Sequence, residues 1–81
     1  MSAIEPWTVE LVGSGKWRFT NATDTLAEMI TLTGIGSVIE TEVPHALAPG
    51  QSFDQKLPAG TGIRILWTTE RRNHHTWEFA G

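Results

Sequence analysis

Short runs in which apolar and polar residues alternate recur along the whole chain, and this period of two limits its fold more than any other feature. In WTVELV, residues 7–12, the side chains of Trp7, Val9 and Leu11 share one phase. Because successive side chains of a β-strand point to opposite faces, the pattern predicts a strand with one buried face. The same alternation, bounded by glycine, proline or asparagine, occurs in four further segments: 16–21, 52–57, 63–69 and 76–79.

The segment TDTLAEMITLTG allows two interpretations. Thr25 and Glu28 have the spacing of a helix capping box, so a short helix at 24–31 is the alternative. The β-branched and alternating run MITLT favours a strand from Glu28 to Thr33 instead. We expect the strand.

Two segments complete the predicted architecture. SVIETEV at 37–43 predicts a further strand, and PHALAPG at 44–50, with two prolines and a glycine, predicts a loop that crosses between sheets. Six or seven short strands separated by turn residues are typical of a small antiparallel sandwich. We therefore expect an all-β fold, with a flexible N-terminal arm at 1–6 and a single β-sandwich domain at 7–81; an α+β fold with the short helix is the alternative.

Composition narrows the class of function. The 81 residues suffice for one core, and 40% of them are hydrophobic, including four tryptophans. Six Lys and Arg against nine Asp and Glu leave a net charge of −3, which argues against nucleic-acid binding. The N-terminal segment lacks the pattern of a signal peptide, and no apolar run approaches the roughly 20 residues of a membrane span. We expect no nucleic-acid partner, no membrane partner and no secretion by a signal peptide.

Two stretches resemble a known family. WRFTNATDTLAEMITLTG and PHALAPGQSFDQKLPAGTGIRILW, within about residues 16–68, have its rhythm of strands, an asparagine turn and a proline–glycine turn. The chain resembles the bacterial immunoglobulin-like sandwiches of the cell-adhesion-related type. The resemblance implies an immunoglobulin-like sandwich that binds or spaces other molecules. Standing alone without a signal, the chain is similar to free-standing bacteriophage modules. This implies a capsid decoration or minor tail protein, on the virion surface or in the cytoplasm of the producing cell.

A polar cluster between the last two predicted strands is the first candidate site. By position it is the tip of a hairpin, and its residues are Arg71, Arg72, Asn73, His74 and His75. Arginine offers forked donors for carboxylate or phosphate, and imidazole changes charge near neutral pH, so the loop is a candidate protein contact. A solvated turn is the competing interpretation. A metal site is disfavoured because adjacent histidines in a strand point to opposite faces.

Apolar residues on the outward phase of the strands are the second candidate site. Met29, Val38 and Leu66 fall among threonine, arginine and glutamate on that phase and would form a contact patch if their strands are neighbours. The four tryptophans fall on the inward phase, which favours core packing over a carbohydrate-stacking platform.

No sequence motif places a nucleophile beside a base or a glycine-rich loop before a helix, so we expect no enzyme, no cofactor and no metal. The expected function is binding to protein subunits of a larger assembly, with self-association as one form of it. A carbohydrate-binding or adhesion module, or a small regulatory partner of a cytoplasmic protein, is the alternative.

Overall fold

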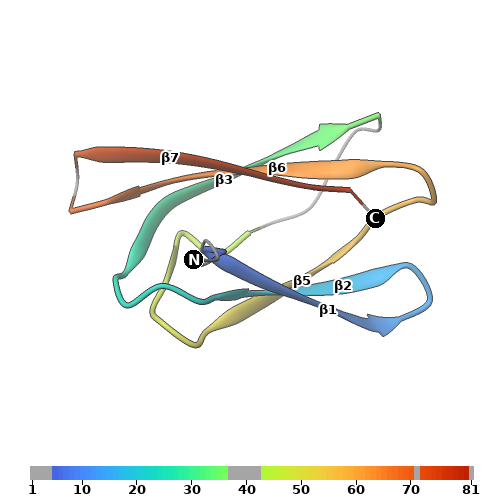
Figure 1. Cartoon of the computed structure of the whole chain (residues 1–81), viewed down its shortest axis with the longest axis horizontal. Coiled ribbons are helices and arrows are strands. Elements are labelled where there is room, and N and C mark those ends of the chain that lie inside the picture. The colour runs from blue at the N-terminus through green and yellow to red at the C-terminus, as the bar shows by residue number, and fades with distance from the viewer. Residues whose placement is uncertain (1–4, 37–42, 71, 81) are drawn as a thin grey trace, which may run out of the picture.

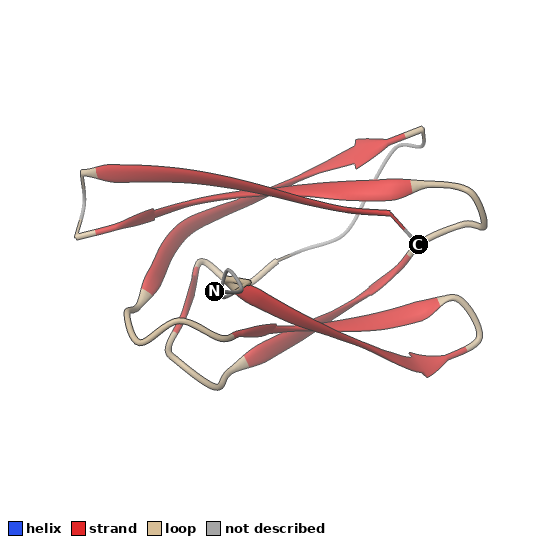
Figure 2. Ribbon diagram, in the orientation of Figure 1, coloured by secondary structure: helices blue, strands red, loops and turns tan. Residues whose placement is uncertain are grey.

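The computed structural model describes residues 5–36, 43–70 and 72–80, which form two antiparallel sheets packed face to face (Figure 1, Figure 2). The three-stranded sheet has the order β1-β2-β5, from Trp7–Gly13, Lys16–Asn21 and Ser52–Lys56. The four-stranded sheet has the order β4-β3-β6-β7, from Ala46–Leu47, Ala27–Ile35, Gly62–Thr69 and Asn73–Ala80. The predicted all-β sandwich is confirmed. The alternative helix at 24–31 is wrong, because β3 begins at Ala27 and no described residue is helical.

The core lies between the sheets and is built from the inward phase of the strands. Its buried hydrophobic residues are Trp7, Phe19, Ala27, Ile30, Leu47, Phe53, Leu57, Ile63, Ile65 and Trp67. Trp7 of β1 meets Trp67 of β6 edge-on, with ring centroids 5.4 Å apart, so these two rings join the sheets. Burial of each large side chain contributes roughly 1.5–3 kcal/mol.

The chain between β3 and β5 differs from the sequence-based expectation. The segment at 44–50 was expected to be a loop, yet Ala46 and Leu47 form β4, paired with Glu28 and Ala27 of β3. The reason is a partner strand far away in the sequence, which the local run of prolines and glycine does not reveal. Of the expected strand at 37–43, residues 37–42 lie outside the described residues. Val43 is not in a strand and packs against the core.

Asn21 ends β2 at the point where the chain leaves the three-stranded sheet. Its side-chain amide donates to the carbonyl oxygens of Thr25, at 3.0 Å, and Leu47, at 2.9 Å. Its carbonyl oxygen accepts from the backbone N–H and the hydroxyl of Thr23, at 2.9 and 2.6 Å. Because the side chain is only 2% exposed, this asparagine fixes both the turn and its attachment to β4.

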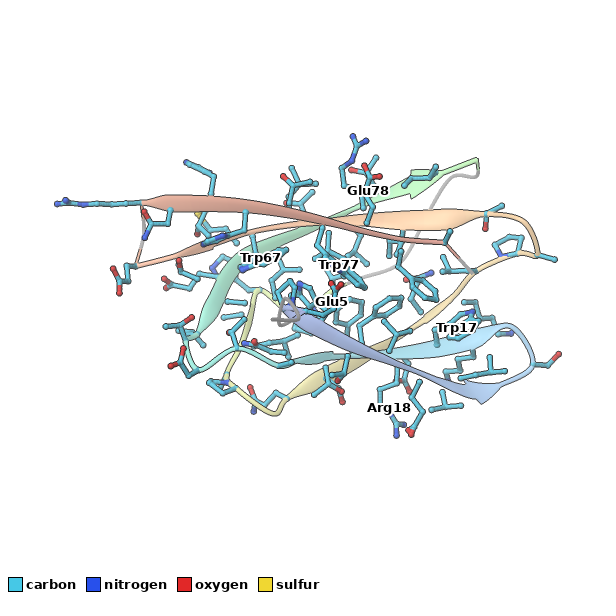
Figure 3. The ribbon with its side chains drawn as sticks, viewed as in Figure 1. Glu5, Trp17, Arg18, Trp67, Trp77 and Glu78 are labelled. Carbon is cyan, nitrogen blue, oxygen red and sulfur yellow. The ribbon has the colours of Figure 1, made fainter. Side chains whose placement is uncertain are left out.

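Residues 5 and 6 of the predicted arm each bond to the domain. The indole N–H of Trp77 in β7 donates to Glu5 Oε2 at 2.6 Å, and the Ala22 N–H donates to the Pro6 carbonyl at 2.9 Å. Figure 3 places Glu5 beside Trp77, so the start of β1 and the middle of β7 lie on the same side of the sandwich.

The described residues include no helix that is long and apolar enough to span a bilayer.

Candidate functional site

The polar cluster predicted as a hairpin tip is divided between a turn and a strand. Glu70 and Arg72 belong to the turn, and the Arg72 N–H donates to the Thr69 carbonyl at 3.2 Å. Arg71 lies outside the described residues. Asn73, His74 and His75 were predicted in the loop, but they form the beginning of β7. Strand β7 begins at Asn73 because the ladder between β6 and β7 continues up to the pair of Thr69 with Asn73.

The two adjacent histidines point to opposite faces of β7. His74 pairs with Thr68, on the outer face of the sheet. The His75 ring stacks on Trp67, with centroids 5.3 Å apart, and its Nε2 lies 2.9 Å from the Thr69 hydroxyl. Among the residues that the structure describes, no group of three His, Asp or Glu side chains could hold a metal ion.

Met29 is the most exposed of the large apolar side chains in the described residues, at 64% exposure. It lies in an irregularity of β3 between Glu28 and Thr31, where the register with β6 shifts. Its φ of +52° falls in the left-handed region, which disfavours a residue with a side chain by about 1–2 kcal/mol. The bulge therefore holds an apolar side chain in solvent, an arrangement typical of functional positions.

Leu66 is half-buried on the outer face of β6, between Thr31 of β3 and Thr76 of β7. Met29 and Leu66, two of the three residues of the predicted patch, therefore lie on neighbouring strands. The third, Val38, is outside the described residues.

Three hollows that share lining residues bring the two candidate sites together, and Met29 lines two of them. One hollow of about 240 Å³ is lined by Met29, Thr31, Leu66, Trp67, Thr68, His74, His75 and Thr76. A hollow of about 310 Å³ adjoins it through Met29 and Thr68 and also touches Glu28 and His45. A third, of about 410 Å³, shares Trp67, His74, His75 and Thr76 and continues to Pro6, Thr23, Thr25 and Thr69. We call the outer-face residues of the first hollow the Met29 face: Met29, Thr31, Leu66, Thr68, His74 and Thr76.

The pair of Thr69 and His75 is the contact in this region that most resembles catalytic machinery. A hydroxyl 2.9 Å from an imidazole nitrogen has the distance of a nucleophile and its base. However, Thr69 is only 8% exposed, and no carboxylate among the described residues bonds to His75 to orient it. The contact fixes the imidazole against Trp67.

The outer face of the three-stranded sheet carries an ion pair in its centre. Arg18 Nε donates to Asp54 Oδ1 at 2.9 Å, and both side chains are partly exposed. The hydrogen bond from Arg18 holds the pKa of Asp54 below its ordinary value, against a smaller opposing effect of desolvation. On the other sheet Arg64 pairs with Glu78 at 2.6 Å. Figure 3 shows Arg18 and Glu78 on opposite outer faces of the sandwich.

The tryptophans lie on the inward phase, as predicted, but they are not equally covered. Trp7 and Trp67 are buried, whereas Trp17 of β2 and Trp77 of β7 are half-buried. Trp17 meets Phe79 edge-on at 5.0 Å. A carbohydrate platform needs an open ring face, and none of the four indoles is fully exposed.

Comparison of the chain with known proteins finds no matching family model, no similar curated protein and no similar solved structure.

Proposed function

We propose that this protein is a non-enzymatic binding module that docks another protein on the Met29 face. The observation that carries the proposal is the single hollow that Met29, Leu66 and His74 line together. An exposed thioether, a half-exposed leucine and an imidazole around one hollow offer apolar contact with a polar rim, which suits a protein surface.

The backbone at Met29 supports the same proposal. A methionine side chain adapts its shape to different partners, and the bulge with positive φ projects it away from the sheet. A strained position of this kind persists where the surrounding structure enforces it, and such positions cluster at functional surfaces.

The more specific proposal is that the partner is a repeated subunit of a larger assembly, such as a capsid or tail. Its support is the family resemblance of the strand and turn pattern alone. In this role the module binds the assembled state and not the free subunits, and by mass action it stabilises the assembly.

The experiment is co-purification of tagged protein from its native source, with copy ratios measured by quantitative mass spectrometry. Wild type is expected to recover one abundant partner near a fixed ratio. Leu66→Glu places a charge in the centre of the Met29 face and is expected to reduce the recovered partner at least about tenfold, or about 1.4 kcal/mol.

The matched control is Thr20→Glu, which adds the same charge to the outer face of β2, the central strand of the other sheet. Thr20→Glu is expected to recover the partner as wild type does. Equal loss in both variants, or loss in neither, would contradict docking on the Met29 face. Recovery of one abundant self-assembling protein would establish the more specific proposal, and recovery of varied proteins at low copy number would overturn it.

A further inference from the structure

The edges of the two sheets are not equally protected against pairing with another chain. The described strands that end a sheet are β1, β5, β4 and β7. The pairing of β1 with β2 shifts register between Leu11 and Gly13, and β5 has five residues and ends in Lys56. Strand β4 has only two residues, and β3, which extends beyond it, contains the irregularity between Glu28 and Thr31. Bulges, lysines and short lengths are the devices by which natural sheets block edge pairing.

Strand β7 has none of these devices. Its eight residues, NHHTWEFA, contain no proline and no lysine, and they pair with β6 without a register shift. Among the described residues β7 pairs on one side only, so its other side presents a regular row of backbone donors and acceptors. An extended strand that adds here forms a continuous sheet.

The side chains of β7 make this edge complementary to itself. On the outer face His74 and Glu78 lie at equal distances along the strand from Thr76. If a second copy pairs antiparallel about a two-fold axis at Thr76, His74 lies opposite the partner's Glu78, and Glu78 lies opposite the partner's His74. An imidazole opposite a carboxylate across a strand pair favours association, and the two-fold axis forms this pair twice.

Other registers are less favourable. An axis at Trp77 aligns residues 74–80, as many as the 73–79 that an axis at Thr76 aligns. It places Glu78 opposite the partner's Thr76, however, and forms no charged pair. An axis at His75 aligns only five residues of the strand, 73–77. A shift by one residue places the outer face of one copy on the inner side of the other.

The inner phase of β7 also gains cover in the register centred on Thr76. Trp77 and Phe79 are half-buried in one copy, and the partner's His75 lies opposite the first and the partner's Asn73 opposite the second. Glu78 is already held by Arg64, whose Nε donates to it at 2.7 Å. A carboxylate accepts several hydrogen bonds, so Glu78 can accept from the partner's His74 while it stays bonded to Arg64.

We propose that two copies of this chain pair antiparallel along β7 about a two-fold axis at Thr76, which joins their four-stranded sheets into one. The outer faces then lie side by side, so the dimer presents two Met29 faces to one side. Binding of both to a repeated partner surface strengthens attachment without any new contact.

The test uses the absence of cysteine from the chain. Under oxidising conditions Thr76→Cys is expected to form a disulfide-linked dimer, because directly opposed Cβ atoms in a sheet lie about 4.5–5.5 Å apart. Thr31→Cys is the matched control, an exposed threonine on the same face but on β3, two strands away from β7. Cross-linking of Thr76→Cys no faster than Thr31→Cys would overturn the proposal.

Sedimentation equilibrium supplies a second measurement on chains without new cysteines. Wild type is expected to dimerise, Glu78→Lys to weaken the dimer at least about tenfold, and the double variant His74→Glu, Glu78→Lys to recover much of the loss. Circular dichroism of each variant checks the fold. A wild type that is monomeric at every concentration, or a double variant no better than the single one, would contradict the proposed register.

Discussion

The outer faces of the two sheets differ in what they present to solvent. A row across the three-stranded sheet is charged in every strand: Glu10, Arg18 and Asp54. A row across the four-stranded sheet carries no charge: Thr31, Leu66 and Thr76. At these two rows, therefore, one sheet presents charged groups that are well hydrated and the other presents groups that give up their water easily.

The difference identifies the face suited to contact. Bringing the charged row against a partner requires desolvation of groups that already satisfy one another, which opposes binding. The threonine and leucine row has a smaller desolvation penalty, and Met29 adds apolar area beside it. The ion pair of the four-stranded sheet, Arg64 with Glu78, lies farther along the strands, beyond the Met29 face.

The largest expected effect tests whether both faces belong to one cooperative unit. Asn21→Ala removes four hydrogen bonds of a buried amide where the chain passes between the sheets. We expect the free energy of unfolding to fall by about 3 kcal/mol. Urea unfolding followed by tryptophan fluorescence measures it, and a single transition is expected. Asn73→Ala changes an exposed asparagine of β7 and is expected to shift stability by less than about 0.5 kcal/mol. Equal stability of the two variants would contradict this account of Asn21.

The next effect compares one glycine from each sheet. A Cβ on Gly62 of β6 would lie 2.5 Å from the Phe79 carbonyl oxygen, so Gly62→Ala must displace β7 and is expected to lose about 2 kcal/mol. A Cβ on Gly13 of β1 would lie 3.6 Å from the Lys16 Cβ, an ordinary contact. Gly13→Ala is therefore expected to unfold within about 0.5 kcal/mol of wild type. Thermal unfolding of the two variants measures this. A loss in Gly62→Ala as small as that in Gly13→Ala would show that the close approach at Gly62 is relieved without strain.

A smaller effect separates stability from binding on the Met29 face. Glycine accepts the positive φ of position 29 without strain, so Met29→Gly is expected to be as stable as Met29→Ala or more stable, by up to about 1 kcal/mol. Both variants lack the thioether side chain, so both are expected to recover less partner than wild type. Chemical unfolding and co-purification on the same samples measure the two quantities. Full partner recovery by Met29→Ala would remove this side chain from the proposed contact.

The smallest effect concerns the charged face at acid pH. The pKa of Asp54 is lower in the folded protein than its unfolded value, because Arg18 donates a hydrogen bond to the carboxylate. Its contribution to stability is therefore present above that unfolded value and is lost as the pH falls through the folded pKa. We expect the stability of Asp54→Asn to fall slightly less than that of wild type between neutral and strongly acid pH. The control is Asp24→Asn, an exposed aspartate that forms no ion pair among the described residues. A difference between Asp54→Asn and wild type that is independent of pH would contradict the linkage.

Alternation predicted most of the fold because it is a local property of a strand with one buried face. Trp7, Phe19, Phe53 and Ile65 fall on the inward phase and are buried, and the outward phase of Met29 and Leu66 is also as predicted. The β-branched run at 28–33 identified β3 correctly, although β3 extends beyond both ends of it. Composition and spacing thus determined the all-β class and most of the packing phase. Two residues depart from them: Leu11, on the same phase as Trp7, is 57% exposed, and the buried Leu47 lies in a segment expected to be a loop.

Features that depend on residues far apart in the sequence were decided by the tertiary structure. Strand β4 exists only through its pairing with β3, and the start of β7 at Asn73 is set by where β6 ends. The bulge that gives Met29 its positive φ follows from the register between β3 and β6. The meeting of Met29 and Leu66 with His74 depends on the strand order β3-β6-β7. A period of two tells which way a side chain points, but strand neighbours and register are chosen by contacts across the whole chain.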